Sequence, residues 1–128
     1  MRDELVAIDL ETTGLDVTQD DIIEIGAVRI KDGVVIDEYS TMVDPGRPIP
    51  SQITHITGIT QDEVDGAPTI KEVLPQLIEF TGDAPIVAHN IALDMGMLQD
   101  KHRILLNNTA IDTYDLALIL MPRAPRYN

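Results

Sequence analysis

The sequence predicts an α/β fold built on a mixed β-sheet, and three observations support this. Short apolar runs alternate with stretches of helical spacing through the second half of the chain, which is typical of parallel β-α-β units. A Lys-Asp-Gly turn at residues 31–33 separates two longer strand-like runs, and Asp-Gly favours an antiparallel hairpin. The chain has 128 residues, of which 44% are hydrophobic, so it can bury the core of one domain.

Five strands are expected in order along the chain. Residues 5–8 are continuously apolar, as expected of a central strand that is buried on both faces. Strands at 22–30 and 34–43 flank the Asp-Gly turn and should pair antiparallel. Two short strands are expected at 86–88 and around Ile111. The last two should add parallel pairing to the sheet.

Capping signals place the helices between these strands. Residues 60–63 and 69–72 both match the capping box, in which a Thr and a Glu three residues later satisfy free backbone amides. Apolar residues at helical spacing follow the second box, with Pro75 inside the helix, where it should bend the axis. Two further helices are expected, one running to about Leu106 and one ending before Pro122.

Composition narrows the classes of function. The chain contains no cysteine, which excludes disulfides and thiolate metal sites. No apolar run approaches the roughly 20 residues that cross a membrane, and no apolar signal segment precedes the first strand, so we expect a cytoplasmic location. The net charge of −13 is unusual for a nucleic-acid-binding protein, which normally carries a basic surface. Acids that hold divalent cations would let such a surface accept a phosphate.

Three acids are the candidate metal ligands. Asp9 and Glu11 should project from the same face of the first strand, because side chains alternate along a strand. Such a pair repels unless a cation lies between the carboxylates, although the pair on its own is better explained as two solvated acids at a strand end. Asp94 follows the fourth strand at the start of a helix, where the helix dipole also favours an acid. Since ligands gather at the carboxyl ends of strands, all three acids together favour a Mg²⁺ or Mn²⁺ site.

Two other acidic sites fit the sequence less well. Residues 9–20 resemble an EF-hand calcium loop, but Asp20 stands where a bidentate Glu is required, and a strand precedes the loop. A phosphoaccepting receiver domain is also small, acidic and α/β. That class needs a Lys at the end of its last strand, where this chain has Ile-Asp-Thr at 111–113. The receiver stays open as a minor alternative.

Four segments carry a family resemblance. AIDLETTGLD, IIEIGAVRI, ITHITGIT and VAHNIALDMGML, in this order, resemble the DnaQ-like 3′→5′ exonucleases of the DEDD type, the proofreading ε-subunit family. The resemblance implies a ribonuclease H-like fold, with a five-stranded mixed sheet, the second strand antiparallel and helices on both faces. It also implies that two divalent metal ions assist hydrolysis at the 3′ end of a single-stranded nucleic acid, expected to be DNA, with release of nucleoside monophosphates.

The resemblance assigns the metal ligands. Asp9 would bridge two Mg²⁺ or Mn²⁺ ions, Glu11 would hold one of them, and Asp94 would complete the shell of the other. Asn90 would brace the site, and His89 is expected to be buried and hydrogen-bonded.

The resemblance also assigns the nucleotide-binding residues. Backbone amides of the turn formed by Thr12, Thr13 and Gly14 would bind the terminal 3′ hydroxyl. Leu15 would lie beside the terminal base, and His55 would line the nucleotide pocket.

The chain departs from the family pattern in two places. Leu93 stands before Asp94, where the family usually has Phe, and no His or Tyr with a later Asp forms a third motif after Asp94. We therefore expect residues 1–128 to be an exonuclease domain truncated before its third motif, with weak or absent activity, since a general base supplies about 10²–10⁴-fold. The parent is expected to be a stand-alone proofreading subunit or a polymerase or helicase. The alternative is an inactive exonuclease-like interaction module.

Overall fold

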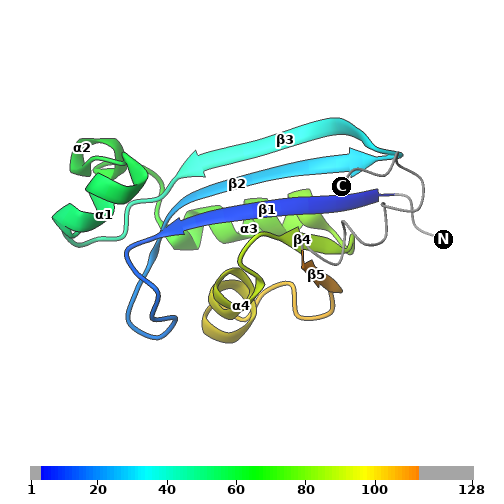
Figure 1. Ribbon diagram of the computed structural model, residues 1–128. Helices are drawn as coiled ribbons and strands as arrows, with labels where there is room; N and C mark the ends of the chain where they lie inside the picture. Colours follow the sequence, from blue (N-terminus) through cyan, green and yellow to red (C-terminus); the bar gives the residue numbers. More distant parts are fainter. Residues whose placement is uncertain (1–3, 113–128) are drawn as a thin grey trace, which may run out of the picture.

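A single five-stranded sheet organises the computed structural model, which describes residues 4–112 (Figure 1). The strand order is β3-β2-β1-β4-β5, so β1 is central. β2 runs antiparallel to both β1 and β3, whereas β4 and β5 continue the sheet in parallel with β1. This confirms the predicted mixed sheet. The strands are β1 (Glu4–Thr12), β2 (Ile22–Lys31), β3 (Val34–Met42), β4 (Ile86–Ala88) and β5 (Ala110–Asp112).

The hairpin between β2 and β3 forms as the sequence predicts. Asp32 and Gly33 have φ angles of 52° and 81°, both in the left-handed region. A two-residue turn of this kind matches the right-handed twist of the strands it joins. The local dipeptide is therefore sufficient to set the pairing of these two strands.

Four short α-helices and a π-helix lie in the described residues, and two of them begin at the predicted capping boxes. They are α1 (Ser51–Thr57), α2 (Gln61–Val64), α3 (Ile70–Thr81), α4 (Ile91–Met95) and a π-helix, η1 (Gly96–Lys101). Both capping boxes form, since Glu63 accepts from the Thr60 amide and Glu72 accepts from the Thr69 amide. None of these helices, which are all that the described residues form, is long and apolar enough to span a bilayer.

Pro75 is tolerated inside α3 because it lies on the solvent side. Pro75 and Lys71, one helical turn earlier, are both exposed. The carbonyl of Lys71 loses the amide that Pro75 does not have, but it can bind water instead.

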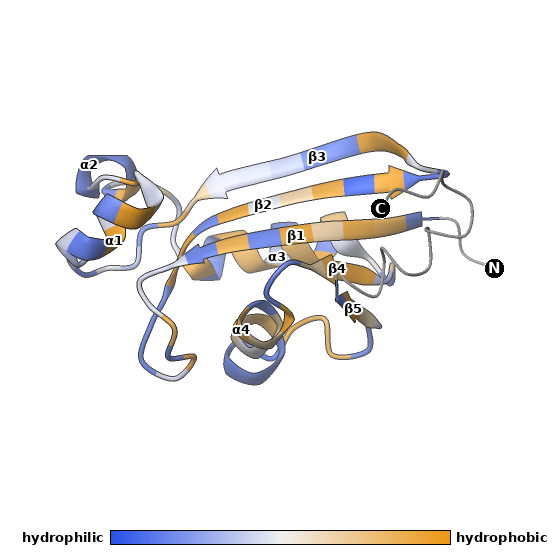
Figure 2. Ribbon diagram, in the orientation of Figure 1, coloured by the Kyte–Doolittle hydropathy of each residue, from blue (hydrophilic) through white to orange (hydrophobic). Residues whose placement is uncertain are grey.

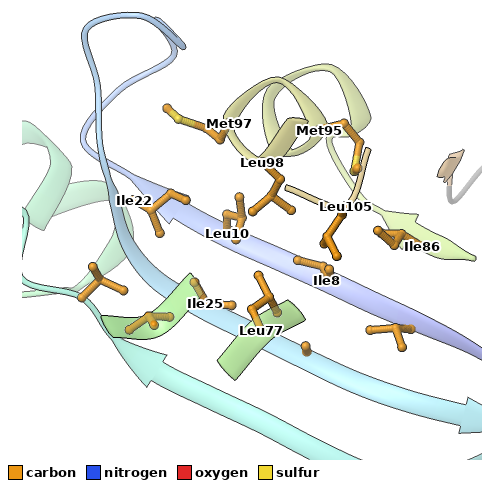
Figure 3. Close-up of a cluster of buried hydrophobic side chains, with 14 of the residues drawn as sticks. Ile8, Leu10, Ile22, Ile25, Leu77, Ile86, Met95, Met97, Leu98 and Leu105 are labelled. Carbon is orange, nitrogen blue, oxygen red and sulfur yellow. The ribbon is translucent and has the colours of Figure 1, made fainter. Parts of the chain in front are cut away.

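The main core lies between one face of the sheet and the helices α3, α4 and η1. Ile8 and Leu10 of β1 meet Leu77 of α3 and Leu98 of η1, and all four side chains are at most 5% exposed (Figure 3). Hydrophobic and hydrophilic stretches alternate along β1 and β2 in Figure 2, as expected when one face is buried. In residues 4–112 these helices cover one face. The helix predicted before Pro122 lies outside the described residues.

One helix boundary was predicted wrongly. The helix expected to run to about Leu106 is regular only to Met95, and it continues as η1 to Lys101. The chain then turns sharply, with positive φ at Arg103 and Leu105, and buries Leu105 against the core. Ile104 and Leu105 therefore pack inward from a loop, while Leu106 is 50% exposed, which helical spacing alone does not reveal.

Candidate active site

Asp9 and Glu11 project from the face of β1 opposite the main core. Leu10, between them, is buried in that core, whereas Asp9 is exposed and Glu11 is half-buried. On the neighbouring strand, Gly26 pairs with Asp9, and Glu24 pairs with Glu11. The alternation predicted from the sequence therefore places both carboxylates on one face.

Asp94 occupies the first turn of α4, as predicted. Asn90 caps this helix, since its Oδ1 accepts from the Leu93 amide at 3.3 Å and its carbonyl accepts from the Asp94 amide at 2.8 Å. The Asp94 side chain is 1% exposed, and its Oδ2 finds no hydrogen-bond donor among the described residues. A buried carboxylate oxygen without a donor is costly, so this atom calls for a positive partner.

The electrostatics link the three acids. Burial, and then the charge of Asp9, raise the pKa of Asp94 to about 7, with a smaller contribution from Glu11. Burial also raises the pKa of Glu11, followed by the charges of Asp9 and Glu24. β4 lies parallel to β1, and α4 follows it, so Asp94 lies at the same end of the sheet as Asp9 and Glu11.

The carboxylates do not form a ready-made metal cage, which corrects the expectation of three tightly gathered acids. In the part of the chain that the structure describes, no group of three or more His, Asp or Glu side chains meets the spacing of a metal site. Like charges repel, so carboxylates have no reason to gather by themselves. The donor chemistry nevertheless suits Mg²⁺ or Mn²⁺, because Asp9, Glu11 and Asp94 offer only hard oxygen atoms and Asp94 has one without a partner.

The turn after β1 begins with two buried threonines and exposes a leucine at its tip. Thr12 and Thr13 are 8% and 4% exposed, and the Thr12 hydroxyl donates to the Gly14 carbonyl at 2.6 Å. Leu15 is 81% exposed, although it is a large apolar residue. A leucine held in water at the tip of an ordered turn is available for contact with a ligand.

The two candidate histidines are both exposed. His55 lies in α1, at the same end of the sheet as the carboxyl terminus of β1 in Figure 1, and no described contact joins it to the three acids. His89 was expected to be buried, which is wrong. It follows β4 at the surface and lines a groove of about 390 Å³ together with Asp9. The preceding strand is buried, but it ends before His89, so the side chain reaches solvent.

Four residues, one beside the acids and three in or against the loop after β1, were not assigned a role from the sequence: Glu24, Asp20, Arg47 and Lys101. Glu24 could have been found from its place in IIEIG, two residues before the glycine that pairs with Asp9. Asp20 bonds Thr13 within the same loop, whereas Arg47 reaches Thr13 and Lys101 reaches Asp20 from distant parts of the chain, where no local pattern marks them.

Comparisons with known proteins agree with this picture. The RNase_T family model, described as Exonuclease, matches residues 6–128. The chain is 49% identical over 123 residues to the DNA polymerase III PolC-type of Clostridium perfringens, covering 94% of this chain and 8% of that protein. It is 40% identical over 122 residues to the PolC-type polymerase of Bacillus subtilis, covering 91% and 8%. The chain thus spans less than a tenth of these curated relatives, which are PolC-type polymerases and are not named as separate ε subunits.

Solved structures confirm the fold. Exonuclease X in complex with 5′ overhanging duplex DNA has a TM-score of 0.67 and 35% identity, covering 97% of this chain and 68% of that chain. Exonuclease I has a TM-score of 0.77 at 16% identity, covering 100% and 33%, and shows likeness of fold alone. The ribonuclease H-like α/β expectation is confirmed.

Proposed function

The chain belongs to the RNase_T exonuclease family, and from this premise we propose that it is the 3′→5′ exonuclease unit of a PolC-type DNA polymerase. Its substrate is a single-stranded DNA 3′ end, and its products are nucleoside monophosphates. The named polymerase relatives support the proofreading context, and the DNA in the exonuclease X complex supports the substrate class. A replication polymerase works where the chromosome lies, which supports the expected cytoplasmic location.

Asp9, Glu11 and Asp94 would hold two divalent metal ions, Mg²⁺ or Mn²⁺. When bound, such ions supply an activated water and charge stabilisation for the departing oxygen. The protein supplies the oxygen ligands from two elements, and the Asn90 cap fixes the turn that carries Asp94. Neutralising these acids would also remove the repulsion between an acidic surface and a phosphodiester.

The Thr12–Leu15 turn would position the terminal nucleotide. Thr12 and Thr13 at the start of this turn are buried and hydrogen-bonded, so its backbone amides are held in place. The exposed Leu15 offers an apolar contact for a nucleobase. His55 would line the same pocket from α1, and His89 would line its groove beside Asp9. The general base of the family's third motif is not assigned to any residue in 4–112.

The single observation that carries this proposal is the buried, unpartnered Oδ2 of Asp94, set in the field of Asp9 and Glu11. A core acid with a pKa near 7 and no donor has no evident use in folding alone, whereas an oxygen ligand needs to be free of other partners.

The test uses the complete natural protein that contains this segment. A single-stranded DNA labelled at its 3′ end, incubated with Mn²⁺ or Mg²⁺, should release labelled nucleoside monophosphate. Asp9→Ala and Asp94→Asn should abolish release, whereas Asp32→Asn, in the distant hairpin turn, should not. Absence of release from the folded wild-type protein would instead favour the inactive interaction module.

A further inference from the structure

The loop between β1 and β2 is built around one carboxylate, that of Asp20. Its Oδ1 accepts from the Thr13 hydroxyl at 2.9 Å, and its Oδ2 accepts from the Asp16 amide at 2.9 Å. Gly14 and Leu15 lie between these two anchor points. The carboxylate therefore closes the turn that the proposed function assigns to the terminal nucleotide.

Gly14 is required by this arrangement because of space. A Cβ atom at position 14 would lie 2.4 Å from Asp20 Oδ2 and 2.7 Å from its Cγ, far inside van der Waals contact. The glycine of the Thr-Thr-Gly sequence thus allows the backbone to pass directly over the Asp20 carboxylate. Gly14 and Asp20 form a matched pair.

Two basic residues hold the loop from either side. Arg47 donates from Nη2 to the Thr13 hydroxyl at 3.1 Å and to the Gln19 carbonyl at 2.7 Å, and its Nε pairs with Asp21 at 2.8 Å. Lys101 donates to the backbone carbonyl of Asp20 and to the Asp21 carboxylate at 3.0 Å. The side chains of Lys101 and Asp20 are only 22% and 21% exposed, so solvent screens the Lys101 contacts less than those of Arg47, whose side chain is 45% exposed.

Lys101 also connects this loop to the helix of Asp94. It is the last residue of η1, which continues α4 without a break. At the first residue of η1, Gly96 approaches Val17 so closely that an added Cβ would lie 2.9 Å from the valine Cγ2. The loop therefore packs against both ends of η1, and the Thr12–Leu15 turn is held relative to Asp94.

We propose that Asp20 is a positioning residue for the exonuclease reaction, acting through Thr13 and Gly14, with Arg47 and Lys101 holding it in place. This inference rests on the proposed function for its consequence, which is correct placement of the 3′-terminal nucleotide. Asp20 is not expected to contact substrate or metal. Its loss should therefore impair nucleotide binding while leaving metal binding intact.

The first experiment compares Asp20→Ala with Asp16→Asn in the complete natural protein. Asp16→Asn removes a charge from the same loop but keeps the Oδ1 that accepts from Thr18, so it is a matched control. Asp20→Ala should raise KM for single-stranded DNA and the Kd of a nucleoside monophosphate, and should lower kcat/KM by about 10–100-fold, the order expected when a reacting group is misplaced by about 1 Å. Mn²⁺ affinity measured without nucleotide should change by less than about twofold. Wild-type KM and nucleotide affinity in Asp20→Ala would overturn the proposal.

The second experiment tests the Gly14–Asp20 pair by a double-mutant cycle. Gly14→Ala alone should weaken nucleotide binding, because its Cβ displaces the Asp20 carboxylate. In the Asp20→Ala background the same change should have a much smaller effect, since the clash is gone. Strictly additive effects would contradict the proposal. If Asp20→Ala does not fold, Asp20→Asn, which retains one acceptor, and Lys101→Met take its place in the binding measurements of the first experiment, and Lys101→Arg is expected to bind nucleotide better than Lys101→Met.

Hydrogen exchange separates failure of this inference from failure of the proposed function. In Asp20→Ala, the amides of residues 13–16 should exchange faster, while those of β1 and β2 keep their protection. This readout does not require activity. If the wild-type protein degrades no DNA but Asp20→Ala exchanges faster at residues 13–16, only the proposed function is refuted. If Asp20→Ala exchanges like wild type at these residues, the positioning role is refuted.

Discussion

Glu11 lies directly opposite Glu24 on the paired strands β1 and β2. Like charges at paired positions of an antiparallel sheet repel, and Glu24 adds to the burial and the Asp9 charge that raise the pKa of Glu11. The negative charge at this end of the sheet therefore comes from four acids on three elements. Such an arrangement costs stability on its own, and a cation bound there would relieve the repulsion.

Glu24→Gln should stabilise the protein when no divalent ion is present. Removing one of two facing charges should raise the free energy of unfolding by about 0.2–1 kcal/mol near pH 7.5. The gain should shrink at about pH 4, because burial and the charges of Asp9 and Glu24 raise the pKa of Glu11, and a protonated Glu11 no longer repels Glu24. Urea denaturation in chelator at both pH values measures this, with the exposed Glu79→Gln of α3 as control. An equal gain at both pH values would mean that the effect is not electrostatic.

Asp94 should make stability depend on pH. Its pKa rises from the usual 3.8 to about 7 in the folded protein, so the unfolded chain releases this proton at lower pH than the folded one. Stability should therefore fall as pH rises from about 4 to about 7, and then level off, by roughly 4 kcal/mol at most. Asp94→Asn should flatten this slope in chelator and be more stable than wild type at pH 8. A wild-type slope in the variant would assign the pH dependence to other groups.

The affinity for a divalent ion should depend on whether Asp94 is protonated. If Asp94 is a ligand, the cation must displace its proton below about pH 7, and affinity should fall by up to about tenfold per pH unit there. Above about pH 7 the affinity should be nearly constant. Calorimetric titration with Mn²⁺ in buffers of different ionisation heat would also count the released proton. Affinity that is flat from pH 5.5 to 8 would exclude Asp94 as a ligand.

The parts of the fold that the sequence predicted are those set by neighbouring residues. The Asp32-Gly33 hairpin and the capping box at Thr69 depend on contacts within four residues, and both form. The parallel pairing followed from alternation of strands and helices. The same kind of reasoning placed Asp9 and Glu11 on one face and Asp94 in a first helical turn.

The parts that were missed depend on residues far apart in the chain. Arg47 meets Thr13 across 34 positions, and Lys101 meets Asp21 across 80, so neither contact leaves a local pattern. The loop after η1 turns Leu105 into the core, and this burial depends on residues far from it in the chain. His89 was misjudged because burial at the end of a short strand depends on which elements cover that edge.

Leu15→Ala should weaken DNA binding without affecting stability. The side chain is 81% exposed, so truncation removes almost no buried surface from the folded protein, and the free energy of unfolding should stay within about 0.5 kcal/mol of wild type. If a base packs on it, the lost apolar contact of about 1 kcal/mol should raise KM for single-stranded DNA about fivefold, with kcat nearly unchanged. Val34→Ala is the matched control, because Val34 is also apolar and exposed but lies beside the hairpin turn at the opposite end of the sheet. Steady-state kinetics of the complete protein decide the matter: an unchanged KM in Leu15→Ala, or an equal rise in both variants, would show that the terminal base does not pack on Leu15.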